Sequence, residues 1–244
     1  MSELKLTSPL VNVDWLAKNL DHPNLVILNA TLARLKRPLP SPELEGIPGS
    51  RNFDLKGVFR DLDAQWPNTV PHPDEFTKQA RKLGINQNSV IVVYDLHGIY
   101  SSPRAWWLFR VMGHDQVGVL DGGFPAWKAA NHPSSEIMSN ENAESKTEGN
   151  FTASFQSKFF ADKDQVLKQS GKPDSAHAIV DARNQGRFNA TTPEPREGLR
   201  GGRIPGSQNL PIAEIIKDGK MLPLDQLEPI YRQLNIANDQ TVFT

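Results

Sequence analysis

The chain has 244 residues, of which 38% are hydrophobic and 23% charged, which is typical of a globular protein of one or two domains. Its 27 basic and 28 acidic residues nearly cancel, which argues against nucleic acid or an anionic membrane as a partner, and its lack of cysteine excludes disulfides and thiolate metal sites. No apolar stretch approaches the roughly 20 residues of a transmembrane helix, and residues 1–12 lack a secretory signal, so we expect a cytoplasmic protein.

Short apolar runs alternate with helical patterns along the chain. The runs do not alternate with polar residues and are partly β-branched, as expected for strands buried on both faces of a parallel sheet. In chain order we predict a helix over 12–19, a strand over 26–28, a helix over 73–83, strands over 90–94 and 117–120 separated by a helix over 103–112, a strand over 178–180, a helix over 224–234 and a strand over 241–244. This order predicts an α/β fold with mainly parallel sheets and helices on both faces.

The chain contains an internal repeat with an offset of about 150 residues, far longer than the period of a solenoid. Ile27-Leu28-Asn29-Ala30 matches Ile179-Val180-Asp181-Ala182, and Ile47-Pro48-Gly49-Ser50 matches Ile204-Pro205-Gly206-Ser207. The runs before residues 90–94 and 241–244 also match, which makes Thr244 the counterpart of Tyr94 and leaves Asp95 without one. About 40 residues that follow Asp95, a strand-helix-strand unit, have no counterpart after Thr244, so we expect the second domain to be incomplete at its C-terminal end.

The repeat and a polar segment divide the chain into domains. Residues 131–150 are rich in Ser, Asn and Glu and have almost no apolar periodicity, which is typical of an exposed linker. We therefore predict a first domain over 1–134, a linker over 135–150 and a second domain over 151–244.

Several ordered motifs carry a family resemblance that covers nearly the whole chain. They are Tyr94-Asp95, Tyr100-Ser101-Ser102-Pro103-Arg104-Ala105-Trp106-Trp107, Leu120-Asp121-Gly122-Gly123, Asp181-Ala182-Arg183, Gly186-Arg187-Phe188, Pro193-Glu194-Pro195-Arg196 and Ile204-Pro205-Gly206-Ser207. With these motifs the chain resembles two-domain rhodanese-type sulfurtransferases, most closely the 3-mercaptopyruvate sulfurtransferases. The resemblance implies tandem rhodanese-like domains.

The resemblance also implies a reaction. In this family a cysteine follows the strand equivalent to 241–244, and backbone N–H groups of its loop lower the thiol pKa, so that the thiolate takes up sulfur as a persulfide. Here that nucleophile is expected immediately after Thr244, and the first repeat has Asp95 at the matching place and is inactive. The implied donor is a small anionic sulfur compound, 3-mercaptopyruvate or thiosulfate; the implied acceptor is cyanide or a thiol such as thioredoxin or a small dithiol. Pyruvate would be the product from 3-mercaptopyruvate, and no cofactor or metal is implied.

Two arginines are implied substrate-binding residues. A guanidinium suits the carboxylate and ketone of 3-mercaptopyruvate as a charge-assisted and often bidentate donor. By resemblance these donors are Arg187 and Arg196, and Arg196 favours 3-mercaptopyruvate because thiosulfate-preferring relatives tend to lack it.

Other candidates have competing structural explanations. Asp54 matches the acidic member of a proton-handling Ser-His-Asp arrangement, but it could equally cap a turn. The family histidine falls at Asn68, and His72, four residues later, could instead belong to a helix entry. For Asp181 and Arg183 we favour a structural salt bridge.

Two alternatives to an enzyme remain at this point. The chain could be an inactive rhodanese-like binding or scaffold protein that keeps an anion-binding cleft, or a fragment. The residue that follows Thr244 in the parent gene, together with the intact mass, distinguishes these from the sulfurtransferase.

Overall fold

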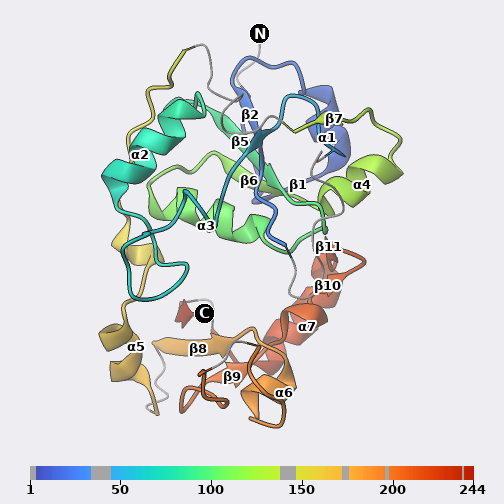
Figure 1. Cartoon of the computed structure of the whole chain (residues 1–244). Helices are drawn as coiled ribbons and strands as arrows, with labels where there is room; N and C mark the ends of the chain where they lie inside the picture. The colour runs from blue at the N-terminus through green and yellow to red at the C-terminus, as the bar shows by residue number, and fades with distance from the viewer. Residues whose placement is uncertain (1–3, 34–44, 138–146, 172–175, 196–197, 238) are drawn as a thin grey trace. The chain divides into compact units, whose positions relative to one another are not determined.

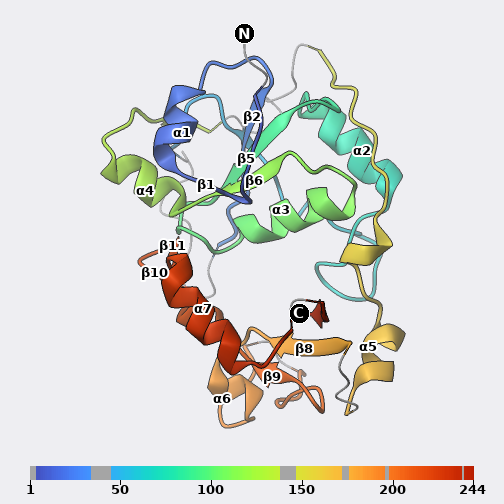
Figure 2. The ribbon, with the colours of Figure 1, turned by 180° about the vertical axis from the view of Figure 1, so that it is seen from behind.

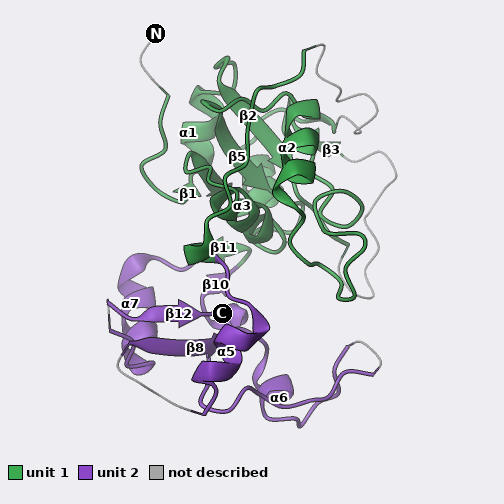
Figure 3. Ribbon diagram, turned by 90° about the vertical axis from the view of Figure 1, so that its left-hand side faces the viewer, with its two compact units in different colours: residues 1–159, 218–220 green, residues 160–217, 221–244 purple. Residues whose placement is uncertain are grey.

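A computed structural model describes residues 4–33, 45–137, 147–171, 176–195, 198–237 and 239–244. The chain forms two compact units, which Figure 3 shows in different colours. Unit 1 consists of Met1–Phe159 and Asp218–Lys220, and unit 2 of Phe160–Lys217 and Met221–Thr244.

Unit 1 is built on a five-stranded parallel sheet with the order β1-β6-β5-β2-β4. Its strands are β1 (Leu10–Val11), β2 (Leu25–Asn29), β4 (Arg51–Asn52), β5 (Val90–Tyr94) and β6 (Val117–Leu120). The central strand β5 is buried along its whole length, which explains its unbroken apolar sequence. A short antiparallel pair, β3 (Glu45–Gly46) and β7 (Ser135–Glu136), lies outside this sheet.

Helices cover both faces of this sheet. Figures 1 and 2 show α1 (Val13–Lys18) and α4 (Gly123–Ala129) on one face, and α2 (Pro73–Lys82) and α3 (Ser102–Val111) on the other. The α1 and α4 face buries a cluster that includes Leu16, Ile27, Val92, Tyr94 and Trp127. The opposite face buries five interacting aromatic rings, Phe53, Phe59, Phe76, Phe109 and Phe151. Each such ring stabilises the fold by roughly 1.5–3 kcal/mol relative to full exposure.

Residues 151–159 belong to unit 1, although the sequence assigns them to the second domain. Phe151 is fully buried against Phe76 and Phe109, and Trp107 Nε1 donates a 2.9 Å hydrogen bond to the carbonyl of Phe159 in the short 3-10 helix η1 (Ser157–Phe159). The first compact unit therefore extends past the predicted linker, because this segment completes its aromatic core.

Unit 2 contains a three-stranded parallel sheet with the order β12-β8-β9. The strands are β8 (His177–Asp181), β9 (Gln208–Asn209) and β12 (Thr241–Phe243); the helices are α5 (Lys163–Gln169), α6 (Gln185–Phe188), α7 (Leu224–Gln233) and the 3-10 helix η2 (Ile212–Glu214). A hairpin of β10 (Ile216–Lys217) and β11 (Lys220–Met221), whose residues Asp218–Lys220 belong to unit 1, precedes α7. Leu227 and Ile230 of α7 pack with Val180 around a core of Leu210, Ile215 and Leu234.

The predicted α/β fold is confirmed, and the internal repeat reappears in the sheet register. In unit 1, Leu28 lies opposite Arg51 and Asn29 opposite Asn52; in unit 2, Val180 lies opposite Gln208 and Asp181 opposite Asn209. The Ile-Pro-Gly-Ser turns that lead into β4 and β9 also match, since each serine N–H donates to the isoleucine carbonyl at 3.0 Å.

The predicted pairing of Thr244 with Tyr94 is wrong by one residue in the register of the sheets. Ile27 lies opposite Val92, whereas its counterpart Ile179 lies opposite Phe243, so Thr244 is level with Val93. The physical reason is the connection that precedes each strand. The left-handed residues Gly84 and Asn235 stand equally far before β5 and β12, so the two strands start at the same level.

The expectation that residues 241–244 are buried on both faces is also wrong. Thr241 is exposed, and Val242 is 44% exposed. The reason is position in the sheet: β5 is flanked by β2 and β6, whereas β12 is an edge strand whose neighbour among the described strands is β8 alone.

Candidate functional site

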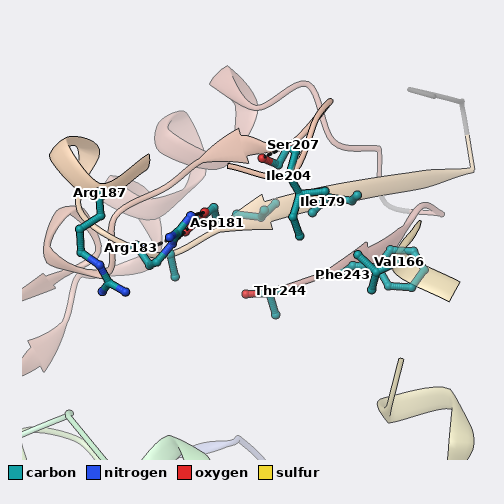
Figure 4. Close-up of a pocket in the computed structure, with 11 residues that line it drawn as sticks. Val166, Ile179, Asp181, Arg183, Arg187, Ile204, Ser207, Phe243 and Thr244 are labelled. Atoms are coloured by element: carbon teal, nitrogen blue, oxygen red, sulfur yellow. Dashed lines mark hydrogen bonds and ion pairs between the residues drawn. The ribbon is translucent and has the colours of Figure 1, made fainter. Parts of the chain in front are cut away.

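A pocket of about 460 Å³ opens in unit 2 at the end of the parallel sheet where β8 and β12 finish. Ligands of open α/β sheets bind at the carboxyl ends of the strands, so this is the expected place for a site. Figure 4 shows charged side chains at one end of the pocket and apolar ones at the other, with Thr244 between them. The charged end consists of Asp181, Arg183 and Arg187, and the apolar end of Val166 and Phe243.

Local sequence places the charged end. Asp181 is the last residue of β8, and its Oδ1 accepts the backbone N–H of Arg183 at 2.9 Å, which turns the chain at the strand end. Asn184 then caps α6, because its side-chain oxygen accepts the backbone N–H of Arg187 at 2.9 Å. A strand end and a helix cap thus fix both arginines within a few residues of each other.

Arg183 is saturated with protein partners. Its Nε lies 3.0 Å from both oxygens of Asp181, and its Nη2 donates to Asp181 Oδ2 at 2.5 Å and to the carbonyl of Gly202 at 2.6 Å. Its Nη1 donates to Glu194 Oε1 at 2.9 Å. All three nitrogens are therefore engaged, so Arg183 braces the loop, as the salt-bridge prediction for Asp181 and Arg183 anticipated.

Arg187 is bound along one edge only. Its Nε and Nη2 donate to the same oxygen, Glu194 Oε2, at 2.9 and 2.6 Å. Its Nη1 has no hydrogen-bond partner among the described residues. Because a guanidinium carries five N–H donors in a planar fork, Arg187 keeps its Nη1–Nη2 edge available for a planar anion such as a carboxylate.

Glu194 connects the two arginines. Its side chain is only 3% exposed, and each of its oxygens accepts from a different guanidinium. Hydrogen bonds from Arg187, with further contributions from Arg183, lower the pKa of Glu194. In the same way the hydrogen bond from Arg183 lowers the pKa of Asp181, and Asp181 raises the pKa of Arg183. Two carboxylates thus face two guanidinium groups, so the formal charges of this cluster cancel.

The structure describes only one of the two predicted substrate-binding arginines. Arg187 lines the pocket, whereas Arg196 lies outside the described residues. Glu194 and the carbonyl of Gly202 are components of the site that sequence reasoning missed. The signal for Glu194 was present in the motif Pro193-Glu194-Pro195-Arg196, where a carboxylate stands between two prolines close to both arginines.

Asp54 lies in unit 1 and caps a turn. Its Oδ1 accepts the N–H groups of Lys56 and Gly57 at 2.9 and 2.8 Å. His72 caps α2 by accepting the N–H of Asp74 at 3.4 Å, and the carbonyl of Asn68 accepts a hydrogen bond from Arg104. The described residues give Asp54 no side-chain hydrogen bond to either Asn68 or His72, and its catalytic role stays a prediction.

Asp95 occupies a cradle of backbone donors in unit 1. Its buried carboxylate accepts N–H groups from His97, Tyr100, Ser101 and Ser102 at 2.9 to 3.0 Å. The loop after β5 and the first turn of α3 thus surround one negative charge, which is the kind of environment that the resemblance implies for a thiolate.

The fold and the site define a rhodanese-like α/β protein with a pocket at the strand ends that Asp181, Arg183 and Arg187 line. The family model of the rhodanese-like domain matches residues 12–130. The 3-mercaptopyruvate sulfurtransferase of Escherichia coli is 34% identical over 240 residues, covering 97% of this chain and 83% of that protein. The thiosulfate/3-mercaptopyruvate sulfurtransferase 1, mitochondrial, of Arabidopsis thaliana is 33% identical over 261 residues, covering 99% and 68%.

Solved structures agree with these relatives. The crystal structure of SseA from Escherichia coli, described as a 3-mercaptopyruvate sulfotransferase with the rhodanese fold, superposes with a TM-score of 0.82 at 31% identity, over 97% of this chain and 87% of that one. Tum1 from Saccharomyces cerevisiae gives a TM-score of 0.80 at 25% identity, over 96% and 82%. The chain belongs to the 3-mercaptopyruvate sulfurtransferase family, and the function of this family is sulfur transfer. Within the described residues, no helix is long and apolar enough to cross a membrane.

Proposed function

We propose that the protein takes the sulfur of 3-mercaptopyruvate onto a cysteine as a persulfide and passes it to a thiol or cyanide acceptor. The observation that carries this proposal is the open Nη1–Nη2 edge of Arg187 in a pocket whose other charged groups pair with one another. A 2-oxo acid carboxylate matches such an edge with two parallel hydrogen bonds. Arg196 completes the proposed substrate-binding pair.

The proposed nucleophile is a cysteine immediately after Thr244, which by the sheet register is one position before the level of Asp95 in unit 1. Thr244 lines the pocket together with Arg187, so the next residue would start from the wall of the same pocket. The 244 residues themselves contain no cysteine. We therefore expect the 244-residue polypeptide alone to bind the substrate anion without turning it over.

The proposed reaction conserves atoms and charge. The thiolate attacks the sulfur of 3-mercaptopyruvate, a sulfur–sulfur bond forms, and the carbon–sulfur bond breaks with its electron pair on carbon. The resulting enolate of pyruvate takes up a proton, and the enzyme keeps a persulfide. A thiol, for example of thioredoxin or of a small dithiol, or cyanide then removes the outer sulfur and restores the thiolate.

The experiment compares two polypeptides, residues 1–244 and the product of the parent gene with its own residue after Thr244. Pyruvate is measured with a coupled lactate dehydrogenase assay, and intact mass reports the gain of one sulfur atom. We expect both signals from the gene product and neither from residues 1–244. A gene product with cysteine after Thr244 that forms no pyruvate would overturn the proposal.

Thiosulfate is the second candidate donor, because the Arabidopsis relative carries both donors in its name. The rate of thiocyanate formation from thiosulfate and cyanide is compared with the rate of pyruvate formation from 3-mercaptopyruvate. This comparison shows which of the two donors the protein prefers. A gene without cysteine after Thr244 would instead support a binding or scaffold role. We also propose the cytoplasm as the compartment.

A further inference from the structure

Glu194 differs from an ordinary surface carboxylate in how its two oxygens are used. Oε1 accepts from Arg183 at 2.9 Å, and Oε2 accepts from both Nε and Nη2 of Arg187. Since Arg183 is itself held by Asp181 and by the carbonyl of Gly202, Glu194 is anchored on its far side. The chain of contacts from Asp181 through Arg183 and Glu194 therefore ends on Arg187.

We propose that Glu194 is a positioning residue that sets the selectivity of the pocket for a 2-oxo acid over a simple carboxylate. It holds the Nε–Nη2 edge of Arg187, so that the Nη1–Nη2 edge keeps one orientation in the pocket. The inference rests on the proposed function, in which Arg187 binds the substrate carboxylate. A fixed guanidinium fixes the carboxylate plane, and with it the direction in which the neighbouring ketone and sulfur project.

The orientation of Arg187 depends on the negative charge and acceptor capacity of Glu194. A glutamine at this position keeps the size but supplies one neutral acceptor and an NH₂ group that repels the arginine donors. Arg187 would then be free to turn, and it would attract any anion without fixing its direction. Removing the charge of Glu194 increases the affinity of the pocket for any anion, whereas releasing Arg187 lowers the preference for a 2-oxo acid over a simple carboxylate. The ratio of the two affinities is therefore the informative quantity.

The test measures the binding of pyruvate and of acetate to residues 1–244 by isothermal titration calorimetry at fixed ionic strength. Both probes carry a carboxylate, and only pyruvate carries the ketone. We compare the natural chain with Glu194→Gln, Glu194→Asp, Arg187→Gln and the control Glu228→Gln, whose carboxylate forms an exposed pair with Arg232 in the same unit. We expect Glu194→Gln to lower the pyruvate-to-acetate affinity ratio on the order of tenfold, Glu194→Asp to retain more of it because the charge remains, and Glu228→Gln to leave it unchanged.

The outcomes separate this inference from the proposed function. If Arg187→Gln binds pyruvate as tightly as the natural chain, the proposed substrate site fails, and the inference fails with it. If Arg187→Gln loses pyruvate but folded Glu194→Gln keeps the natural ratio, only the inference is overturned. Equal loss in Glu194→Gln and Glu194→Asp would also overturn it, because the charge would then not be what holds Arg187.

A measurement on the unaltered chain covers the case in which Glu194→Gln fails to fold. The Nε–H signal of Arg187 in a ¹H–¹⁵N spectrum, assigned by its loss in Arg187→Gln, reports the hydrogen bond to Glu194. We expect this signal to stay in its hydrogen-bonded position when pyruvate is added. A shift to the position of an exposed arginine would mean that the ligand displaces Glu194, and this would refute the positioning role.

Discussion

Ser102 holds Asp95 with two hydrogen bonds, because both its backbone N–H, at 3.0 Å, and its hydroxyl, at 2.9 Å, donate to Asp95 Oδ2. Asp95 is fully buried, and three further N–H groups of its loop also point at its carboxylate. This carboxylate therefore organises the connection from β5 into α3.

Asp95→Ala should destabilise unit 1 by roughly 3 kcal/mol, since it leaves several buried N–H groups without an acceptor. All five tryptophans of the chain lie between residues 15 and 127, so the urea dependence of tryptophan fluorescence reports unit 1. Asp115→Ala is the control, because Asp115 is 74% exposed in its pair with Arg110. A loss no larger than that of Asp115→Ala would contradict the organising role of Asp95.

Tyr94→Phe should cost roughly 1–3 kcal/mol in the same assay, because the buried phenol accepts the N–H of Ile47 at 3.1 Å and pairs with Ser50 Oγ at 2.8 Å. Burial raises the pKa of Tyr94 to about 12. Because its pKa is higher in the folded state, Tyr94 contributes its full stabilisation below the unfolded pKa of about 10. This contribution is lost as the pH rises toward about 12. The alkaline loss should therefore shrink in Tyr94→Phe, and an unchanged alkaline limb would argue against this assignment.

The free energy of unfolding of unit 2 should fall in acid, because Asp181 and Glu194 become protonated. The pKa of each is lowered in the folded state, the first chiefly by Arg183 and the second chiefly by Arg187. Folded protein thus binds fewer protons, so the stabilisation is present above the unfolded values of about 3.9 and 4.3 and is lost as the pH falls below them. Amide hydrogen exchange of residues 176–195 between pH 5 and pH 2.5, corrected for intrinsic exchange rates, measures this loss. Asp181→Asn should flatten the dependence, and an equally steep curve would exclude Asp181 as a source.

Arg183 and Arg187 should separate into a structural and a ligand-binding residue. Arg183→Gln removes contacts to Asp181, Glu194 and Gly202, so it should destabilise unit 2 on the order of 1–2 kcal/mol. Arg187→Gln should reduce pyruvate binding at least tenfold with a smaller effect on folding. Hydrogen exchange and calorimetry on both variants test this division, which the reverse pattern would refute.

Sequence reasoning predicted the helices and strands well because their patterns are local. The predicted helix over 73–83 and strands over 90–94 and 117–120 agree with α2, β5 and β6 to within one residue. The same reasoning misjudged residues 241–244, because burial depends on which strands lie alongside, and β12 has β8 on one side only. It also placed Phe151 outside the first unit, since the aromatic rings that cover it are far away in sequence.

The sequence by itself determined the α/β class, the internal repeat and the family, because apolar periodicity and ordered motifs are properties of the chain. Only the tertiary structure decided how many protein partners each arginine has. Arg183 and Arg187 are equally charged and nearly adjacent in sequence, and they differ because Asp181, Glu194 and Gly202 converge on one of them in space. Hydrogen-bond saturation is a matter of three-dimensional geometry, and residue spacing alone does not encode it.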